Sequence, residues 1–212
     1  MSARRWNVKR LRLAFAIISG MPSVFFFGAM SPYSWFAAER IGTQLPDAEW
    51  RPVFAGGLFK ACGRVSWGLT EDRATKLADC QARARAYGLG PIHWPDPWPT
   101  NDVLIARAMI VADQRGALTP FALTAMRMAF GEGLDLGQTG VVRAVAERSG
   151  LGGEEIAEAI RDPEVKAALR AANDEAVALG VFGVPSVRVG ATLFWGDDRL
   201  EQAAALATHT AG

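Results

Sequence analysis

A serine-proline pair, Ser31-Pro32, stands where an apolar run gives way to a helical pattern. Residues Val24 to Phe27 predict a buried strand, and the residues from Trp35 onward predict a helix. The first N–H groups of a helix are unpaired and carry partial positive charge, so they lower the pKa of a thiol held there. The Ser31 hydroxyl could add a hydrogen bond to that thiolate. The pattern therefore indicates either a binding site for an external thiolate or simple capping of the helix by Ser31.

The same turn lacks the thiols of a redox site. Ser31 and Ser34 occupy the two cysteine positions of a Cys-x-x-Cys motif, and the chain's two cysteines, Cys62 and Cys80, form no such motif. Dithiol redox chemistry is therefore not expected. With only 2 histidines in the chain, we expect no metal site, and a reducing cytoplasm is the default location.

A second candidate is the dipeptide Val184-Pro185, which precedes the predicted strand Ser186–Val189. A cis peptide at this position would turn the backbone N–H and C=O of Val184 toward the helix N-terminus. That edge could pair with a cysteinyl peptide as an added strand. An ordinary loop is the alternative.

The segment Trp195-Gly196-Asp197-Asp198 closes a predicted hairpin and opens the last helix. Either aspartate could cap that helix. The functional alternative is that the free N–H groups bind a carboxylate while an aspartate binds an ammonium. A γ-glutamyl group carries both charges, so it would satisfy this segment.

Lys60 follows the second predicted strand, Glu49–Phe54, and we expect it on a loop near the thiolate. There its ammonium could hold a substrate carboxylate. The rings of Trp94, Trp98, Trp195 and Phe59 could form the walls of an aromatic pocket, although tryptophans pack in cores just as often.

The charge balance excludes a broadly basic surface. The 212 residues include 23 basic and 22 acidic side chains, so we expect no nucleic-acid partner. Residues 1–20 are basic, and their apolar run is too short for a secretory signal or a spanning helix. We interpret them as an N-terminal extension upstream of a natural start at Met21, with a targeting segment as the alternative, and we expect no membrane partner.

The predicted elements form the order strand-helix-strand, helical block, helix-strand-strand-helix. This order is typical of an α/β thioredoxin-like fold with a large all-helical insertion. We assign residues 21–60 and 165–212 to the thioredoxin-like core and residues 61–164 to the insertion. The last two strands, Ser186–Val189 and Thr192–Trp195, are joined by a predicted hairpin at Gly190-Ala191.

Together these pieces resemble the 2-hydroxychromene-2-carboxylate isomerases and the related kappa-class glutathione transferases. The resemblance runs from about residue 24 to residue 200. It rests on five stretches: Ser31 to Trp35, Gly56 to Lys60, Trp98 to Asn101, Gly180 to Pro185, and Phe194 to Leu200. The last two in tandem are the most specific.

The resemblance implies a homodimeric, glutathione-dependent isomerase of aromatic-ring-fused pyruvate adducts in bacterial aromatic hydrocarbon catabolism. It matches Ser31 to the glutathione sulfur and Val184 to the cysteinyl backbone. It matches residues 195–198 to the γ-glutamyl end and Lys60 to the small aromatic carboxylate substrate. We also expect Arg64 and Trp98 to contact that substrate.

Two departures from the family pattern alter this expectation. The family usually has Asp-Phe before the serine, where this chain has Gly28-Ala29, and it often has Asn where Arg64 stands. A kappa-type glutathione transferase or peroxidase and a non-catalytic thioredoxin-like binding module therefore remain open as alternatives.

Overall fold

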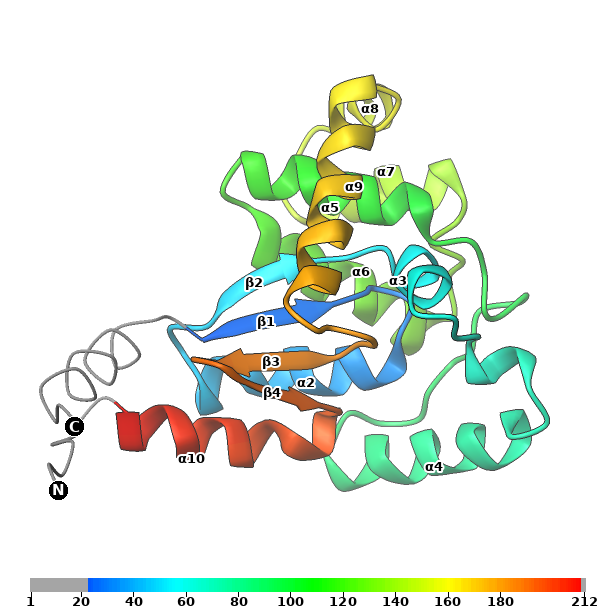
Figure 1. Ribbon diagram of the computed structural model, residues 1–212. Helices are drawn as coiled ribbons and strands as arrows, with labels where there is room; N and C mark the ends of the chain where they lie inside the picture. The colour runs from blue at the N-terminus through cyan, green and yellow to red at the C-terminus, as the bar shows by residue number, and fades with distance from the viewer. Residues whose placement is uncertain (1–22, 211–212) are drawn as a thin grey trace, which may run out of the picture.

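A four-stranded mixed sheet forms the centre of the computed structural model, which describes residues 23–210. Its strands lie in the order β2-β1-β3-β4 (Figure 1). Strand β1 (Val24–Phe27) is parallel to β2 (Glu49–Pro52) and antiparallel to β3 (Ser186–Val189), which pairs with β4 (Thr192–Trp195). The predicted strands are confirmed, except that β2 ends at Pro52, and the order and pairing are those of a thioredoxin-like fold.

The phenylalanines of β1 explain why both faces of the sheet are covered. Side chains alternate along a strand, so Phe25 and Phe27 point to one face and Phe26 to the other. Phe25 and Phe27 lie in the large core with helices α2 (Pro32–Gln44) and α10 (Leu200–Thr210). Phe26 lies in a second core with α3 (Ala55–Ala61) and α9 (Pro163–Ala178). All three rings are buried.

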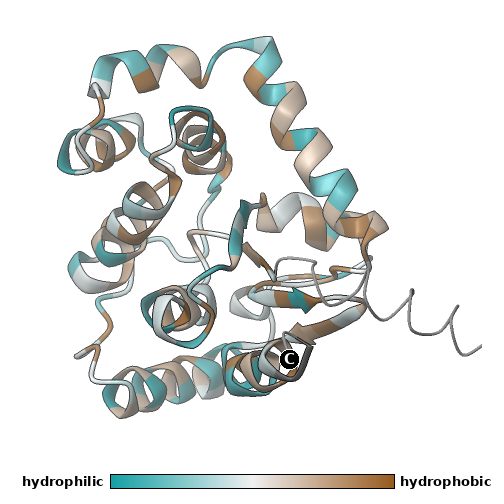
Figure 2. Cartoon of the chain, turned by 90° about the vertical axis from the view of Figure 1, so that its left-hand side faces the viewer, coloured by the Kyte–Doolittle hydropathy of each residue, from teal (hydrophilic) through white to brown (hydrophobic). Residues whose placement is uncertain are grey.

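The helical block lies beyond the β2 edge of the sheet, where α5 contacts β2 and α6 contacts α2 (Figure 1). Most helices carry hydrophobic and hydrophilic residues on different faces (Figure 2). The helices of this block are α5 (Val103–Gln114), α6 (Leu118–Glu132), α7 (Thr139–Arg148) and α8 (Gly153–Ala159), whereas α4 (Arg73–Ala86) lies on the opposite side, toward the β4 edge of the sheet (Figure 1).

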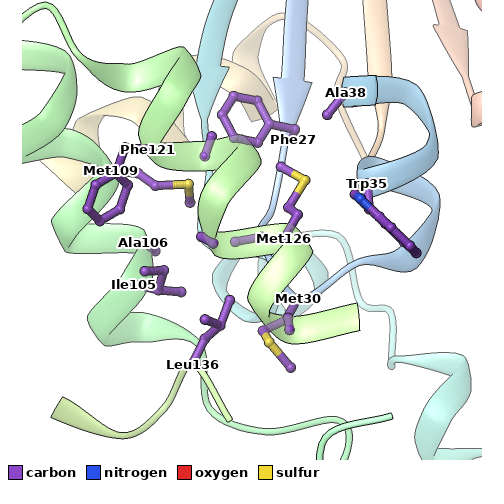
Figure 3. Packing of buried hydrophobic residues seen from close by; sticks show 14 of the residues in the cluster. Phe27, Met30, Trp35, Ala38, Ile105, Ala106, Met109, Phe121, Met126 and Leu136 are labelled. Carbon is purple, nitrogen blue, oxygen red and sulfur yellow. The ribbon is translucent and has the colours of Figure 1, made fainter. Parts of the chain in front are cut away.

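The turn between β1 and α2 is packed against this helical block. Met30, on the turn, lies with Leu136, Ile105 and Met126 in one buried cluster (Figure 3). Met30 is 6% exposed and the other three are fully buried. The residue that precedes Ser31 is therefore held by side chains from a distant part of the sequence.

Three local features of the structure bear on the sequence predictions. The Val184-Pro185 peptide is cis, and Gly190 at the hairpin has a φ of 57°, so both predictions are confirmed. The predicted loop around Lys60 is wrong, because residues Ala55–Ala61 form helix α3. Asn173 of α9 accepts a hydrogen bond from Phe54 N–H and donates one to Phe54 C=O, both at 2.9 Å, and so fixes the start of this helix.

The basic segment 1–20 lies outside the described residues. Across residues 23–210, no helix combines the length and apolar character needed to cross a bilayer.

Candidate functional site

Ser31 caps helix α2 and begins the candidate thiolate site. Its Oγ accepts a hydrogen bond from Ser34 N–H at 3.2 Å, and its own N–H donates to Gly28 C=O at 3.1 Å. Pro32 has no N–H, so Tyr33 N–H is the first backbone donor of the helix. The Ser31 O–H proton is a further donor, because a hydroxyl that accepts one bond can still donate another. The turn therefore presents a hydroxyl and a helix N-terminus together.

Ser34, the other hydroxyl of the turn, points inward. It is fully buried and its Oγ accepts a 3.4 Å hydrogen bond from Gly28 N–H. Cys80 is also fully buried, and burial raises the pKa of its thiol. Neither Ser34, Cys80 nor the half-buried Cys62 lines the two cavities described next.

A cavity of about 440 Å³ opens beside Ser31, and we call it the aromatic cavity. Trp98 is part of its wall: it is 6% exposed and its ring lies 4.6 Å from that of Trp67. Trp98 Nε1 donates to Met30 C=O at 3.3 Å, which ties this wall to the Ser31 turn. Its lining also includes Tyr33, Phe59, Lys60, Arg64, Pro99, Asp102 and Val184.

Lys60 and Arg64 supply the positive charge of the aromatic cavity. Both are exposed, and Lys60 lies in the last turn of α3. The Arg64 guanidinium donates to Phe182 C=O at 3.3 Å and lies 4.7 Å from the centre of the Trp195 ring. Arg64 therefore spans from the aromatic cavity to the hairpin residue predicted for the γ-glutamyl end.

A second cavity, of about 290 Å³, adjoins the first, and we call it the charged cavity. It shares Tyr33 and Val184 with the aromatic cavity. Its lining includes the predicted residues Trp195, Gly196, Asp197 and Asp198, together with Lys76, Arg83, Pro185 and Arg199. The structure thus brings the nine residues expected to contact glutathione or substrate, Ser31 included, to two neighbouring cavities.

The two aspartates of the charged cavity differ in environment. Asp197 is 1% exposed, with one carboxylate oxygen 3.0 Å from Arg83 and the other accepting from Tyr87 O–H at 3.0 Å. Burial raises the pKa of Asp197, and the Arg83 charge and the Tyr87 hydrogen bond oppose that rise. Asp198 is exposed, so it is the carboxylate available to a ligand ammonium.

Several lining residues were missed in the sequence. Tyr33 lies between the two cavities and donates to Asp79 at 3.2 Å, while Arg83 bridges Asp79 and Asp197. The i,i+4 spacing of Asp79 and Arg83 on a predicted helix was the available signal for their pairing. Trp67 could not be found this way, because it lies on a 3-10 helix of three residues, Trp67–Leu69, which is too short to show a periodic pattern. Of the four predicted aromatic walls, Trp94 packs behind Trp98 and does not line either cavity.

The part of the chain that the structure describes contains no group of three or more His, Cys, Asp or Glu that could hold a metal ion.

Comparisons with known proteins agree on the kind of protein to which this chain is similar. Residues 24–207 match the DSBA-like thioredoxin domain. The chain is 29% identical over 195 residues to a 2-hydroxychromene-2-carboxylate isomerase from Sphingobium xenophagum, covering 84% of this chain and 93% of that protein.

Solved structures show the same fold. A 2-hydroxychromene-2-carboxylate isomerase structure superposes with a TM-score of 0.80 at 20% identity, covering 89% of this chain and 95% of the other. A probable DsbA oxidoreductase from Streptomyces coelicolor gives 0.72 at 19% identity, covering 89% and 90%.

Proposed function

The chain belongs to the DSBA-like thioredoxin domain family, and within it we propose a glutathione-dependent isomerase of 2-hydroxychromene-2-carboxylate-type compounds. The similarity to the Sphingobium xenophagum enzyme supports an isomerase-type function. One observation carries the proposal of a glutathione-dependent reaction. A charged cavity and an aromatic cavity adjoin each other near Ser31 and share Tyr33 and Val184 in their walls.

The charged cavity fits the charges of glutathione. This tripeptide has two carboxylates and one ammonium, and the cavity offers the cations Lys76 and Arg199 with the exposed carboxylate Asp198. The backbone of Val184 lies between this cavity and Ser31, where it can pair with the cysteinyl residue.

The aromatic cavity fits a flat carboxylate. The Trp98 and Trp67 rings offer faces for a fused aromatic ring, and Lys60 or Arg64 can bind its carboxylate. The cavity is close in size to typical small-ligand sites, which run from about 300 to 1,000 Å³.

Glutathione, when bound, supplies a thiolate that can add to a conjugated double bond and so permit rotation about it. The protein's part is to hold that sulfur as a thiolate, with the Ser31 hydroxyl and the Tyr33 N–H as donors. Lys60 orients the substrate carboxylate, and the tryptophan wall excludes water. A dithiol oxidoreductase function does not fit this chain, because positions 31 and 34 are both serine.

Glutathione binding by calorimetry tests the proposal. It is measured at about pH 7 and about pH 8.5, below and at the usual pKa of a thiol. We compare wild type, Ser31→Ala and the matched control Ser34→Ala, which removes a buried hydroxyl outside both cavities. The proposal expects micromolar-to-millimolar binding with proton release, weakened in Ser31→Ala only.

Turnover then separates the candidate functions. Isomerisation of 2-hydroxychromene-2-carboxylate with no loss of glutathione supports the proposal, whereas consumption of glutathione would indicate a kappa-type transferase or peroxidase. A folded protein that binds no glutathione would refute the proposal in favour of a non-catalytic binding module.

A further inference from the structure

Asp102 is a buried carboxyl group in the wall of the aromatic cavity. It is 5% exposed and lies at the start of α5, directly after the segment Trp98 to Asn101. Ser31, Lys60 and Trp98 line the same cavity. An acidic side chain so deeply buried is rare unless it has a partner.

Asp102 has no such partner within residues 23–210. None of the ion pairs in this part of the chain includes it, and its side chain makes no capping bond to α5. The N–H of Val103, which a capping aspartate could bind, donates instead to Asn101 Oδ1 at 3.2 Å. Only the backbone amide of Asp102 itself hydrogen-bonds to the carboxylate. A buried carboxyl that does not cap its helix needs another explanation, and here the position of Asp102 in the cavity wall indicates a role toward a bound ligand.

The surroundings keep this group near its neutral form. Burial raises the pKa of Asp102 to about 7, and the bond from its own amide lowers it only in part. Both the acid and the carboxylate are therefore populated at neutral pH, which is the condition for efficient proton transfer.

The other ionisable groups around the cavity are either exposed to solvent or already bound to a partner. Lys60 and Arg64 are exposed at its opening, and Tyr33 donates to Asp79. Behind the Trp98 segment, Arg73 donates to Trp98 C=O at 2.8 Å, and Asp135 accepts from Gly137 N–H at 2.8 Å. Asp102 is thus the buried carboxyl left for proton transfer in this cavity.

We propose that Asp102 is a catalytic residue that transfers a proton within the bound substrate. The inference rests on the proposed function, because 2-hydroxychromene-2-carboxylate is a cyclic hemiketal that must open before it can isomerise. The Asp102 O–H gives its proton to the ring oxygen as the bond from that oxygen to the hemiketal carbon breaks. The same carboxyl takes the proton of the hemiketal hydroxyl as the carbonyl forms, so no net proton or electron is exchanged.

Kinetics of three variants test the assignment. Asp102→Asn removes the acid at nearly constant size, and Asp102→Glu restores a carboxyl. Asp96→Asn is the matched control, because it makes the same chemical change at an exposed position six residues earlier in the chain. The readouts are kcat against pH at saturating glutathione, the Kd of glutathione by calorimetry, and the titration of the Asp102 carboxyl carbon by NMR.

We expect Asp102→Asn to lower kcat by about 10²- to 10⁴-fold with an unchanged glutathione Kd. In wild type kcat falls as the pH rises through about 7, since only the acid can protonate the ring oxygen. This decrease of kcat with pH should be absent in Asp102→Asn. It should return in Asp102→Glu, with its midpoint at a different pH. The NMR titration should report an ionisation of Asp102 near the same pH.

Four results would overturn the assignment, three of them without touching the proposed function. An Asp102→Asn enzyme with wild-type kcat and pH profile would refute the inference alone. So would an Asp102 carboxyl that titrates at its usual pKa, or a variant whose residual activity keeps the wild-type decrease of kcat with pH. A wild type that binds glutathione but does not convert the substrate would refute the proposed function, and this inference with it.

Discussion

The aromatic and charged cavities share Tyr33 and Val184, and each has a buried carboxyl in its wall, but the two carboxyls differ in their partners. In the charged cavity Asp197 is held by Arg83 and Tyr87, each 3.0 Å away. In the aromatic cavity Asp102 has only its own backbone amide. Burial raises the pKa of both, but only in the first case do a charge and a hydroxyl work against it. The partnered carboxyl fixes structure, whereas the unpartnered one is free to exchange a proton.

The partnered case also explains how a distant helix is fixed to the site. Arg83 belongs to α4 and Asp197 follows β4, 114 residues later. Their ion pair joins α4 to the hairpin that closes the charged cavity. Arg40 adds to this junction, with its guanidinium 4.1 Å from the centre of the Tyr87 ring.

Removing the partner from Asp197 should have the largest effect on stability. Arg83→Met leaves a buried carboxylate without its cation, and we expect a loss of about 3–5 kcal/mol in the free energy of unfolding. The control Arg115→Met breaks an exposed pair with Glu155 and should lose less than about 1 kcal/mol. Urea denaturation of both variants checks this, and equal losses would show that Asp197 does not depend on Arg83.

The unpartnered carboxyl should make stability depend on pH. Asp102 keeps its proton up to about pH 7 in the folded state but loses it near 3.8 in the unfolded chain. Folding stability should therefore fall as pH rises between those values, by an amount on the order of 4 kcal/mol. Thermal melts of wild type and Asp102→Asn should agree near the lower limit and diverge toward the upper one. Parallel curves across the window would contradict the prediction.

Two matched lysine substitutions should separate the roles of the cavities. Lys60→Met is expected to raise KM for the aromatic carboxylate about tenfold, because a charge-assisted bond is lost. Lys76→Met should instead weaken glutathione binding by a similar factor. Steady-state kinetics with each ligand varied in turn measure both, and a Lys60→Met enzyme altered only toward glutathione would reverse the assignment.

Arg64→Met should give the smallest effect, spread over both ligands. Its guanidinium contacts Phe182 and Trp195 and lines the aromatic cavity, but it is exposed. We expect a rise of about two- to fivefold in both KM values, in keeping with a screened charge. A change confined to one ligand would place Arg64 in a single cavity.

The features that could be predicted from the sequence are those recorded in short segments. The three phenylalanines of β1, the Ser31-Pro32 turn and the Val184-Pro185 dipeptide each carry their own local signal. For the same reason the thioredoxin-like order of elements follows from local sequence patterns alone.

The features that could not be predicted depend on contacts between distant segments. Helix α3 is difficult to predict because it contains Gly56 and Gly57, whose helix propensity is poor. Its start is fixed by hydrogen bonds with Asn173 from α9. A Cβ on Gly57 would lie 2.8 Å from Asn173 Nδ2, so the close approach of these helices depends on that glycine. The partner of Asp197 and the isolation of Asp102 are equally non-local.

The packing of Met30 against the helical block makes the Ser31 turn part of the same cooperative unit as that block. Because Met30 lies in one buried cluster with Leu136, Ile105 and Met126, the turn cannot open without exposing that cluster to water (Figure 3). Amides of α2 that are bonded within the helix, beginning with Trp35 N–H to Ser31 C=O, should then exchange with solvent as slowly as those of α5 and α6. The donors that hold a thiolate would be preorganised by the stability of the whole molecule.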